Sequence, residues 1–249
     1  MPRINISTKI ILADKDKALI ISTIESSGEV QMDLDLYFLD QTINSEDINF
    51  TLRFYTWKEN CLSIGFHQKL MPKHWLNLAD QGLIKIIKRP SGGGAVLHSG
   101  GITYALTFKK PLYKKMSYQI VNNWLIASFS RMGLVLKQGH IKKSLIQDNC
   151  FGSKFTSDLI DQDGYKRIGS AQYWKKGSFL QHGEILLNPP SELWLKVFRD
   201  EAPPKLKLTM NREEIINKLR DYFIESYSES SVEYLLIPCD DIQKIIQKN

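Results

Sequence analysis

Arg89-Pro90-Ser91-Gly92-Gly93-Gly94-Ala95-Val96-Leu97-His98 is the stretch around which the rest of the chain is arranged. The apolar run Leu83–Ile87 leads into it, and a second apolar run, Ile102–Phe108, follows it. Adjacent glycines leave backbone N–H groups uncovered and allow positive φ angles, so a ligand can approach the main chain closely. Successive uncovered N–H groups can also bind an anion. Two interpretations are open: the tip of a β-hairpin, or a binding site, which the cations before the glycines and the histidine after them favour.

The composition describes an ordinary globular chain with a moderate positive charge. Its 249 residues are 43% hydrophobic and 24% charged, with a net charge of +6 at pH 7. That charge is too small to argue for nucleic-acid binding by itself, although it suits a partner with an acidic surface. A chain of this length buries roughly three quarters of its surface on folding, so residues 1–249 can form one large domain.

The chain shows no sign of export or membrane insertion. It has no run of about 18 apolar residues and no signal-peptide layout at its start. Its three cysteines lie far apart, which fits a reducing compartment. We therefore expect a cytoplasmic protein with neither a membrane nor a nucleic acid as its partner.

Hydrophobic periodicity predicts helices interspersed with strands. Met32, Leu36, Leu39 and Ile43 recur at helical spacing, and Asn211 with Glu214 resembles a capping box. Helices are expected near residues 32–43, 74–80, 120–132, 191–198 and 211–223. Strands are expected within 4–24, near 50–57, 61–66, 83–87, 102–108, 165–174 and 179–187, and after 232. The sum predicts an α+β fold, a mixed or antiparallel sheet flanked by helices.

Asp163-Gly164 is a strong signal for a hairpin turn between two of these strands. If the loop holds two residues, Lys166 lies opposite Asp161 and points to the same face as Ile168, Ser170 and Gln172. The simplest interpretation of Lys166 is then a surface lysine paired with Asp161.

Cys150 is a candidate nucleophile in a basic neighbourhood, residues 137–154. Chemistry needs its thiolate, and a free thiol with a pKa near 8.5 is only a few per cent ionised at pH 7. Lys166 could accept the proton only if burial or a neighbouring cation, such as Arg167, lowered its pKa from about 10.4. On composition alone, Cys150 is more simply an ordinary half-buried residue.

The remaining candidate side chains do not form a metal site. His98 and His182 each lie beside glycine-containing sequence, without cysteines or carboxylates at metal-ligand spacing. A single histidine is more often a structural hydrogen-bonding residue than a catalyst. Cys61 and Cys239 have no companion features and are interpreted as structural, so no metal is expected.

Three motifs together resemble the signature of the biotin/lipoate protein ligase superfamily. They are Lys88–His98 with Gly101–Leu106, Lys166–Gln172, and Leu180–Leu186, with a weaker match at Gln31–Asp35. The motifs follow the family's order and spacing and cover roughly residues 28–190, which makes the match specific. They resemble the lipoate branch, and within it the LipM-type octanoyltransferases, more than the biotin branch, whose Gly-Arg-Gly-Arg type loop is missing here.

The resemblance implies transfer of an acyl group to a lysine of a lipoyl domain. Octanoyltransferases take octanoate from acyl carrier protein onto a cysteine that precedes a Phe, and Asn149-Cys150-Phe151 matches that pattern. It implies Cys150 as nucleophile, Lys166 as the group that takes protons from thiol and amine, and no cofactor. The acceptor would be a lipoyl-domain protein such as glycine cleavage H protein or a 2-oxoacid dehydrogenase E2 subunit.

The same resemblance implies the binding residues. The glycine loop and the two histidine motifs would hold the substrate, and backbone N–H groups of one of the loops would hold the oxyanion. An apolar slot would take the eight-carbon chain, with Val96, Leu97 and Tyr104 as candidates. The basic residues 137–154 would meet the acidic partners. The binding residues so implied are Arg89, Ser91, Gly92, Gly93, Gly94, Val96, His98, Tyr104, Gly169, Ser170, Ala171 and His182.

Other chemistries remain open within the same superfamily. A lipoate–protein ligase would use ATP and Mg²⁺, would bind an adenylate with Lys166, and would not need Cys150. An amidotransferase between lipoyl domains would need Cys150 but not acyl carrier protein. A binding module would need neither residue.

The sequence differs from the family's motifs at two places. Lys88 stands where family members have the first of two arginines, and Tyr165 separates Gly164 from Lys166. Because of these differences, the identity of the transferred acyl group stays open. We expect no separate C-terminal accessory domain, and the sequence does not predict the oligomeric state.

Overall fold

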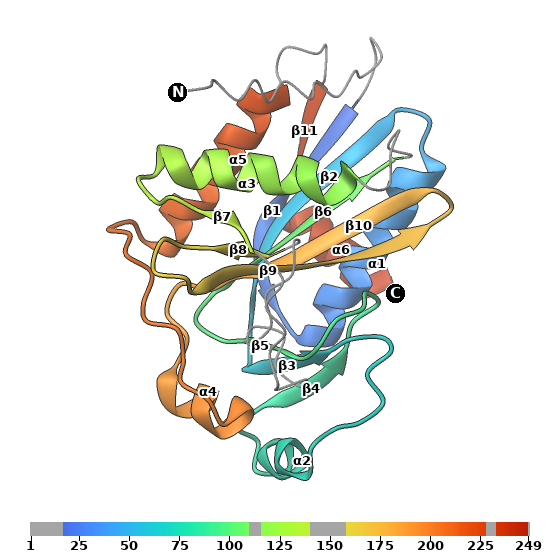
Figure 1. The fold of residues 1–249 in the computed structure, drawn as a ribbon. Coiled ribbons are helices and arrows are strands. Elements are labelled where there is room, and N and C mark those ends of the chain that lie inside the picture. The colour runs from blue at the N-terminus through green and yellow to red at the C-terminus, as the bar shows by residue number, and fades with distance from the viewer. Residues whose placement is uncertain (1–16, 110–115, 140–157, 228–232, 249) are drawn as a thin grey trace.

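The computed structural model describes residues 17–109, 116–139, 158–227 and 233–248 (Figure 1). The helices in these ranges are α1 (Gly28–Asn44), α2 (Lys73–Asp80), α3 (Ser117–Arg131), α4 (Ser191–Phe198), α5 (Arg212–Tyr227) and α6 (Cys239–Lys248). The strands are β1 (Lys17–Ser26), β2 (Ile48–Trp57), β3 (Cys61–Ile64), β4 (Lys85–Lys88), β5 (Val96–His98), β6 (Ile102–Phe108), β7 (Lys137–Gln138), β8 (Leu159–Ile160), β9 (Lys166–Lys175), β10 (Ser178–Ile185) and β11 (Glu233–Ile237). None of the described helices is long and apolar enough to cross a membrane.

The strands form one large and one small sheet. The large sheet has eight strands in the order β11-β1-β2-β6-β10-β9-β8-β7, and the small sheet has the order β4-β3-β5. In the large sheet β1 runs parallel to both of its neighbours, whereas the pairs from β2 onward are antiparallel. The predicted α+β fold with a mixed sheet flanked by helices is confirmed.

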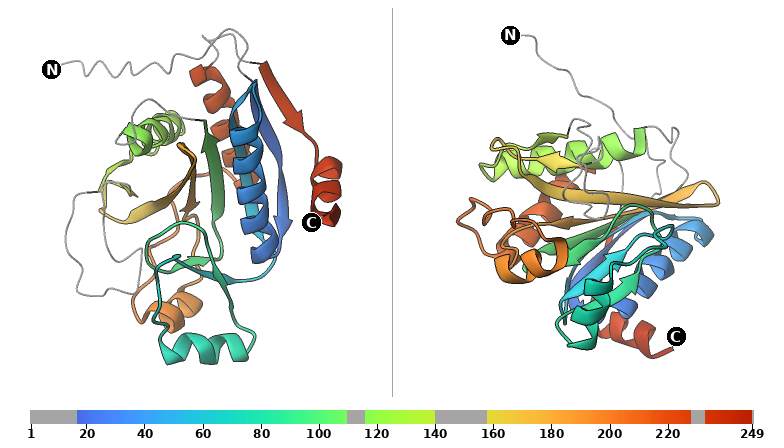
Figure 2. Two further views of the ribbon diagram at one scale, coloured as in Figure 1. Left: turned by 90° about the vertical axis from the view of Figure 1, so that its right-hand side faces the viewer. Right: turned by 60° about the horizontal axis from the view of Figure 1, so that its bottom comes forward.

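Alternating apolar residues let the large sheet pack against helices on both faces. Within β1, Ala18 and Ile20 join a core with α3 and α5, and Leu19 and Ile21 join a second core with α1 and α6. Successive side chains of a strand point to opposite faces, so a strand covered on both sides is apolar at consecutive positions. Figure 2 shows α3 and α1 on opposite sides of this sheet.

The glycine-rich segment does not close a hairpin. β4 leads into it and β5 follows it, but both strands pair with β3, which lies between them. β4 runs parallel to β3 and β5 runs antiparallel to it, so Arg89–Ala95 passes across the end of β3. The interpretation as a hairpin tip is therefore wrong, because the two flanking strands are not neighbours.

The turn before β9 contains three residues, one more than the two-residue loop considered above. Asp161 and Tyr165 close it through a backbone hydrogen bond of 2.9 Å, and Gly164 has φ +86°. A three-residue loop that ends in a left-handed residue adds a bulge and shifts the register. Lys166 consequently pairs with Ile160, and the expected pairing with Asp161 is wrong. Asp161 instead binds Arg167 at 2.5 Å.

Candidate active site

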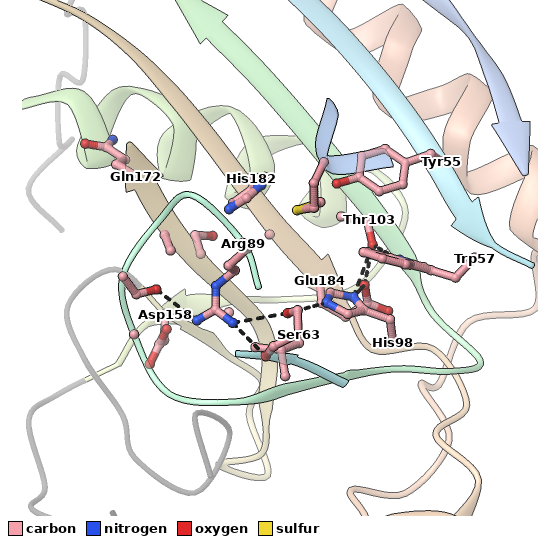
Figure 3. Close-up of a pocket in the computed structure, with 18 of the residues that line it drawn as sticks. Tyr55, Trp57, Ser63, Arg89, His98, Thr103, Asp158, Gln172, His182 and Glu184 are labelled. Carbon is pink, nitrogen blue, oxygen red and sulfur yellow. Dashed lines mark hydrogen bonds and ion pairs between the residues drawn. The ribbon is translucent and has the colours of Figure 1, made fainter. Parts of the chain in front are cut away.

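A cavity of about 300 Å³ lies between the two sheets, and side chains from both sheets line it (Figure 3). Met32, Tyr55, Trp57 and Val96 give it an apolar wall. The glycine loop, the middle of β9 and the end of β10 supply most of the other lining residues, and β3, β5, β6, α3 and the residue before β8 supply the remainder. The lining residues are Met32, Tyr55, Trp57, Ser63, Arg89, Gly92, Gly93, Val96, His98, Thr103, Tyr118, Asp158, Gly169, Ser170, Ala171, Gln172, His182, Gly183 and Glu184.

Arg89 shapes the glycine loop from inside. Its guanidinium donates to the carbonyl oxygens of Gly92 and Gly94 at 2.8 and 2.6 Å, and to the Ser63 carbonyl oxygen at 2.8 Å. The loop also lies against β3, because a Cβ placed on Gly65 would be 2.0 Å from the Gly93 carbonyl oxygen. Only glycine at position 65 permits this approach. The loop is thus held in one conformation with Gly92 and Gly93 facing the cavity.

A first chain of hydrogen bonds runs from the loop to α1. Ser91 Oγ lies 2.5 Å from His182 Nε2, and His182 Nδ1 lies 2.9 Å from Asp35 Oδ2. Asp35 is also paired with Arg53 at 2.8 Å and accepts a hydrogen bond from the Tyr55 hydroxyl at 3.0 Å. All five side chains are buried, so each needs these partners. The chain fixes the orientation of His182 and the position of Ser91.

A second chain runs through the other histidine. Ser63 Oγ lies 2.8 Å from His98 Nε2, and His98 Nδ1 lies 2.8 Å from Glu184 Oε2. Thr103 donates to the same carboxylate oxygen, and the Trp57 ring stacks on His98 at a centroid distance of 4.1 Å. Burial lowers the pKa of His98, although the Glu184 carboxylate works in the opposite direction. A neutral His98 can accept from Ser63 and donate to Glu184 at the same time.

The wall formed by β9 is supported from behind by Tyr104. Its hydroxyl lies 2.7 Å from Ser170 Oγ and accepts from Gln181 Nε2 at 2.8 Å. Burial raises the pKa of Tyr104 above its usual value. A Cβ on Gly183 would be 2.7 Å from the Gly169 carbonyl oxygen, so β9 and β10 approach closely at this point only because glycine is present. Tyr104 therefore positions Gly169–Ala171 and does not itself line the cavity.

Lys166 forms a buried ion pair at the start of β9. Its Nζ lies 2.9 Å from Asp158 Oδ2, and the two side chains are 1% and 3% exposed. Asp158 lines the cavity, so Lys166 adjoins the cavity through this ion pair. Cys150 lies outside the described residues, as do His140, Lys142, Lys143 and Lys154 of the predicted basic stretch. Lys137, at the start of that stretch, is exposed on β7.

Most of the predicted binding residues lie together at this cavity. Arg89, Gly92, Gly93, Val96, His98, Gly169, Ser170, Ala171 and His182 line it. Ser91 and Tyr104 act from behind through hydrogen bonds, Gly94 contributes a carbonyl oxygen to Arg89, and Leu97 packs in the core of the small sheet. Among the described residues, no three His, Cys, Asp or Glu side chains gather as metal ligands.

Both histidines have acidic partners that were not predicted from the sequence. Asp35 and Glu184 lie within the quoted motifs Gln31–Asp35 and Leu180–Leu186, so the signal was present. Ser63, Trp57 and Asp158 were also missed, because each lies on a different element and nothing local marks it.

Comparison with known proteins gives a consistent result. A model of the lipoyl protein ligase A/B catalytic domain matches residues 27–226. An octanoyltransferase LipM from Clostridioides difficile is 34% identical over 162 residues, which are 61% of this chain and 59% of that protein. The chain thus spans less than two thirds of that relative's length. An octanoyltransferase LipM from Halalkalibacterium halodurans is 28% identical over 224 residues, which are 78% of this chain and 81% of that protein.

Solved structures show the same fold at lower identity. A lipoate-protein ligase A bound with ATP superposes with a TM-score of 0.72 at 17% identity and covers 94% of this chain and 95% of that one. A bipartite lipoate protein ligase from Thermoplasma acidophilum, described with its E2 lipoyl domain, gives 0.68 at 18% identity, with coverage of 94% and 93%. At these identities the similarity establishes the fold and no particular reaction.

Proposed function

The chain belongs to the lipoyl protein ligase A/B catalytic domain family, and on that basis we propose that it is an octanoyltransferase. It moves an octanoyl group from acyl carrier protein to a lysine of a lipoyl-domain protein, through a thioester on Cys150. The acceptor class is glycine cleavage H protein or an E2 subunit. Relatives named octanoyltransferase LipM match 61% and 78% of the chain, which supports the proposal.

The observation that carries the proposal is the apolar cavity beside the Lys166–Asp158 ion pair. Met32, Tyr55, Trp57 and Val96 offer an apolar surface to an acyl chain. Burying a methylene contributes about 0.8 kcal/mol, so an eight-carbon chain gains several kcal/mol there. This gain is sufficient to hold an acyl group while its carbonyl lies toward β9 and Lys166.

The first half-reaction is a thiol exchange. The Cys150 thiolate attacks the carbonyl carbon of the carrier's thioester, and backbone N–H groups of Gly169–Ala171 or of the glycine loop stabilise the oxyanion. The carbon–sulfur bond to the carrier then breaks, and the carrier sulfur takes up a proton from solvent, which replaces the proton that the Cys150 thiol released to solvent before the attack. Because Lys166 Nζ lies 2.9 Å from Asp158 Oδ2, we assign Lys166 the task of stabilising the Cys150 thiolate and not of removing its proton.

The second half-reaction transfers the acyl group to nitrogen. The lysine amine of the lipoyl domain attacks the thioester on Cys150, an amide bond forms, and the carbon–sulfur bond breaks. The departing Cys150 sulfur takes the proton that the amine loses, so the site returns to its starting state. The donor thioester is already activated, so this route requires neither ATP nor Mg²⁺.

Two alternatives use the same cavity. The fold is also that of lipoate–protein ligases, one of which is bound with ATP. A ligase would form an acyl-adenylate from free lipoate and would not depend on Cys150. An amidotransferase would depend on Cys150 but would take its acyl group from another lipoyl domain.

The deciding experiment is intact-mass measurement after incubation with octanoyl-acyl carrier protein in the absence of ATP. We expect the wild type to gain one octanoyl group that hydroxylamine removes, and Cys150→Ala to gain none. Cys239→Ala is the matched control, because Cys239 is an exposed free cysteine, and it should be acylated like the wild type.

Two other results would replace the proposal. Modification of a lipoyl domain only with ATP and free lipoate, equally by wild type and Cys150→Ala, would identify a ligase. Acylation of Cys150 by an octanoylated lipoyl domain but not by the carrier would identify an amidotransferase.

A further inference from the structure

The connection from β3 to α2 and the first turn of α2 carry large apolar side chains that are exposed to solvent. Phe66, Leu70, Met71 and Leu76 are 54%, 84%, 39% and 43% exposed. Single exposed apolar residues are ordinary, whereas a group of them on one short segment marks a surface that binds another molecule. Two exposed lysines lie among them. We define the apolar–basic patch as Phe66, Lys69, Leu70, Met71, Lys73 and Leu76.

The charge of this segment has one sign. Between Gly65 and Ala79 the sequence has Lys69 and Lys73 but no Asp or Glu. Lys88 adds a third exposed cation, with its Nζ 4.9 Å from the centre of the Phe66 ring. A surface of exposed apolar side chains and cations complements a partner whose contact face combines apolar side chains with carboxylates.

The patch begins at the glycine loop. The Phe66 backbone N–H donates to the Ser91 carbonyl oxygen at 2.8 Å, and the preceding Gly65 lies against the Gly93 carbonyl oxygen. Gly93 lines the cavity. From there the patch extends to α2, which lies at the edge of the molecule beyond the small sheet (Figure 1). One end of the patch therefore adjoins the cavity and the other end lies away from it.

We propose that the apolar–basic patch is the docking surface for the acidic carrier protein that brings the octanoyl thioester. This inference rests on the proposed function and adds the place where the donor binds. A lysine side chain is short, so an acceptor domain must lie directly over the cavity to deliver its amine. A carrier protein presents its acyl group on a longer prosthetic arm, so its body can bind on a surface that extends away from the cavity.

The test separates the two half-reactions with a charge-reversed double variant, Lys69→Glu/Lys73→Glu. We expect its rate of acylation by octanoyl-acyl carrier protein to fall about 10- to 30-fold through loss of electrostatic attraction. Acylation by octanoyl-pantetheine, which lacks the carrier protein, should be unchanged. Transfer from a preformed acyl-enzyme to a lipoyl domain should also be unchanged. Added salt should slow the carrier reaction of the wild type more than that of the variant.

Two further variants address charge and apolar contact separately. Lys205→Glu/Lys218→Glu makes the same change in net charge at exposed positions outside the patch, and it should keep most of the carrier rate. Leu70→Gln changes the most exposed apolar side chain of the patch without altering charge. It should slow acylation by the carrier several-fold and leave the octanoyl-pantetheine rate unchanged.

The possible failures are distinguishable. An unchanged carrier rate in the double variant overturns the docking site. A loss confined to the second half-reaction also overturns it, because the patch would then bind the acceptor. An equal loss with octanoyl-pantetheine means that the substitutions damage the cavity, and this too overturns the assignment. If the wild type is acylated by neither donor, the proposed function fails and the docking assignment fails with it.

Discussion

The two described cysteines should differ in reactivity, because one is buried and the other is exposed. Cys61 is fully buried, and burial, reinforced by the charge of Glu59, raises the pKa of its thiol to about 12. Cys239 is exposed. Because the thiolate is the nucleophile, iodoacetamide near neutral pH should label Cys239 and spare Cys61 in the folded protein. Peptide mass spectrometry checks this, with urea-unfolded protein as the control in which Cys61 is labelled.

His98 should make stability depend on pH. Burial lowers its pKa below the ordinary value of 6.5. Below that value the unfolded chain therefore binds a proton that the folded chain does not, and stability is lost as the pH falls through this window. Between about pH 7.5 and 5.5, the melting temperature of the wild type should fall more than that of His98→Gln. Equal falls in the two proteins would contradict this account.

The chemistry of single residues was only partly predictable from the sequence. The histidines and the glycine loop stood out because their residue types are informative by themselves. Asp35 did not, since a carboxylate on a helix normally points to solvent, and only the fold places it beside Arg53 and His182. Lys166 was identified, but its partner Asp158 depends on a register that one extra loop residue changes.

At the scale of elements, the contact between β3 and the glycine loop makes a sharp prediction. Gly65→Ala places a methyl group 2.0 Å from the Gly93 carbonyl oxygen, so backbone must move. We expect a loss of about 1–3 kcal/mol in the free energy of unfolding. Gly92→Ala is the matched control, because its methyl group would meet no atom within 4 Å. Urea unfolding of both variants measures the difference, and equal losses would refute the contact.

Elements with local signals were predicted well, and their spatial order was not. The capping box of α5 is present, with Asn211 and Glu214 exchanging hydrogen bonds of 2.7 and 3.0 Å. Gly82, two residues after the end of α2, has φ +69°, the left-handed conformation that often follows the C-terminus of a helix. In contrast, nothing in β4 or β5 indicates that β3 separates them, because strand order depends on contacts distant in the sequence.

At the scale of the whole molecule, stability should differ between the centre and the edge of the large sheet. All seven residues of β6 are buried, between β2 and β10. β11 ends the sheet, pairs with β1 and is mostly exposed. Amides of β6 should therefore exchange with solvent deuterium only on global unfolding, and those of β11 through local opening at lower free energy. Hydrogen-exchange mass spectrometry tests this, and equal protection of the two strands would contradict it.

The overall architecture followed from the motifs more than from periodicity. Periodicity predicted the helices and strands but did not distinguish a mixed sheet from an antiparallel one. The motifs resembled those of one superfamily, and the solved structures share its fold. The small sheet was not anticipated as a separate body. Its strands are short, and a strand of three or four residues such as β5 carries little periodic signal.

The two Ser–His–carboxylate chains have a consequence for how such a protein can evolve. His182 and Glu184 lie two residues apart on β10, and Arg89 donates both to Ser63 and to the loop that carries Ser91. A substitution in one hydrogen-bond chain therefore changes the surroundings of the other. The effects of two substitutions, one in each hydrogen-bond chain, on stability or activity will not be additive. During evolution these residues should therefore change together and not one at a time. Epistasis between the positions limits which variants are accessible, in addition to the tolerance of each position alone.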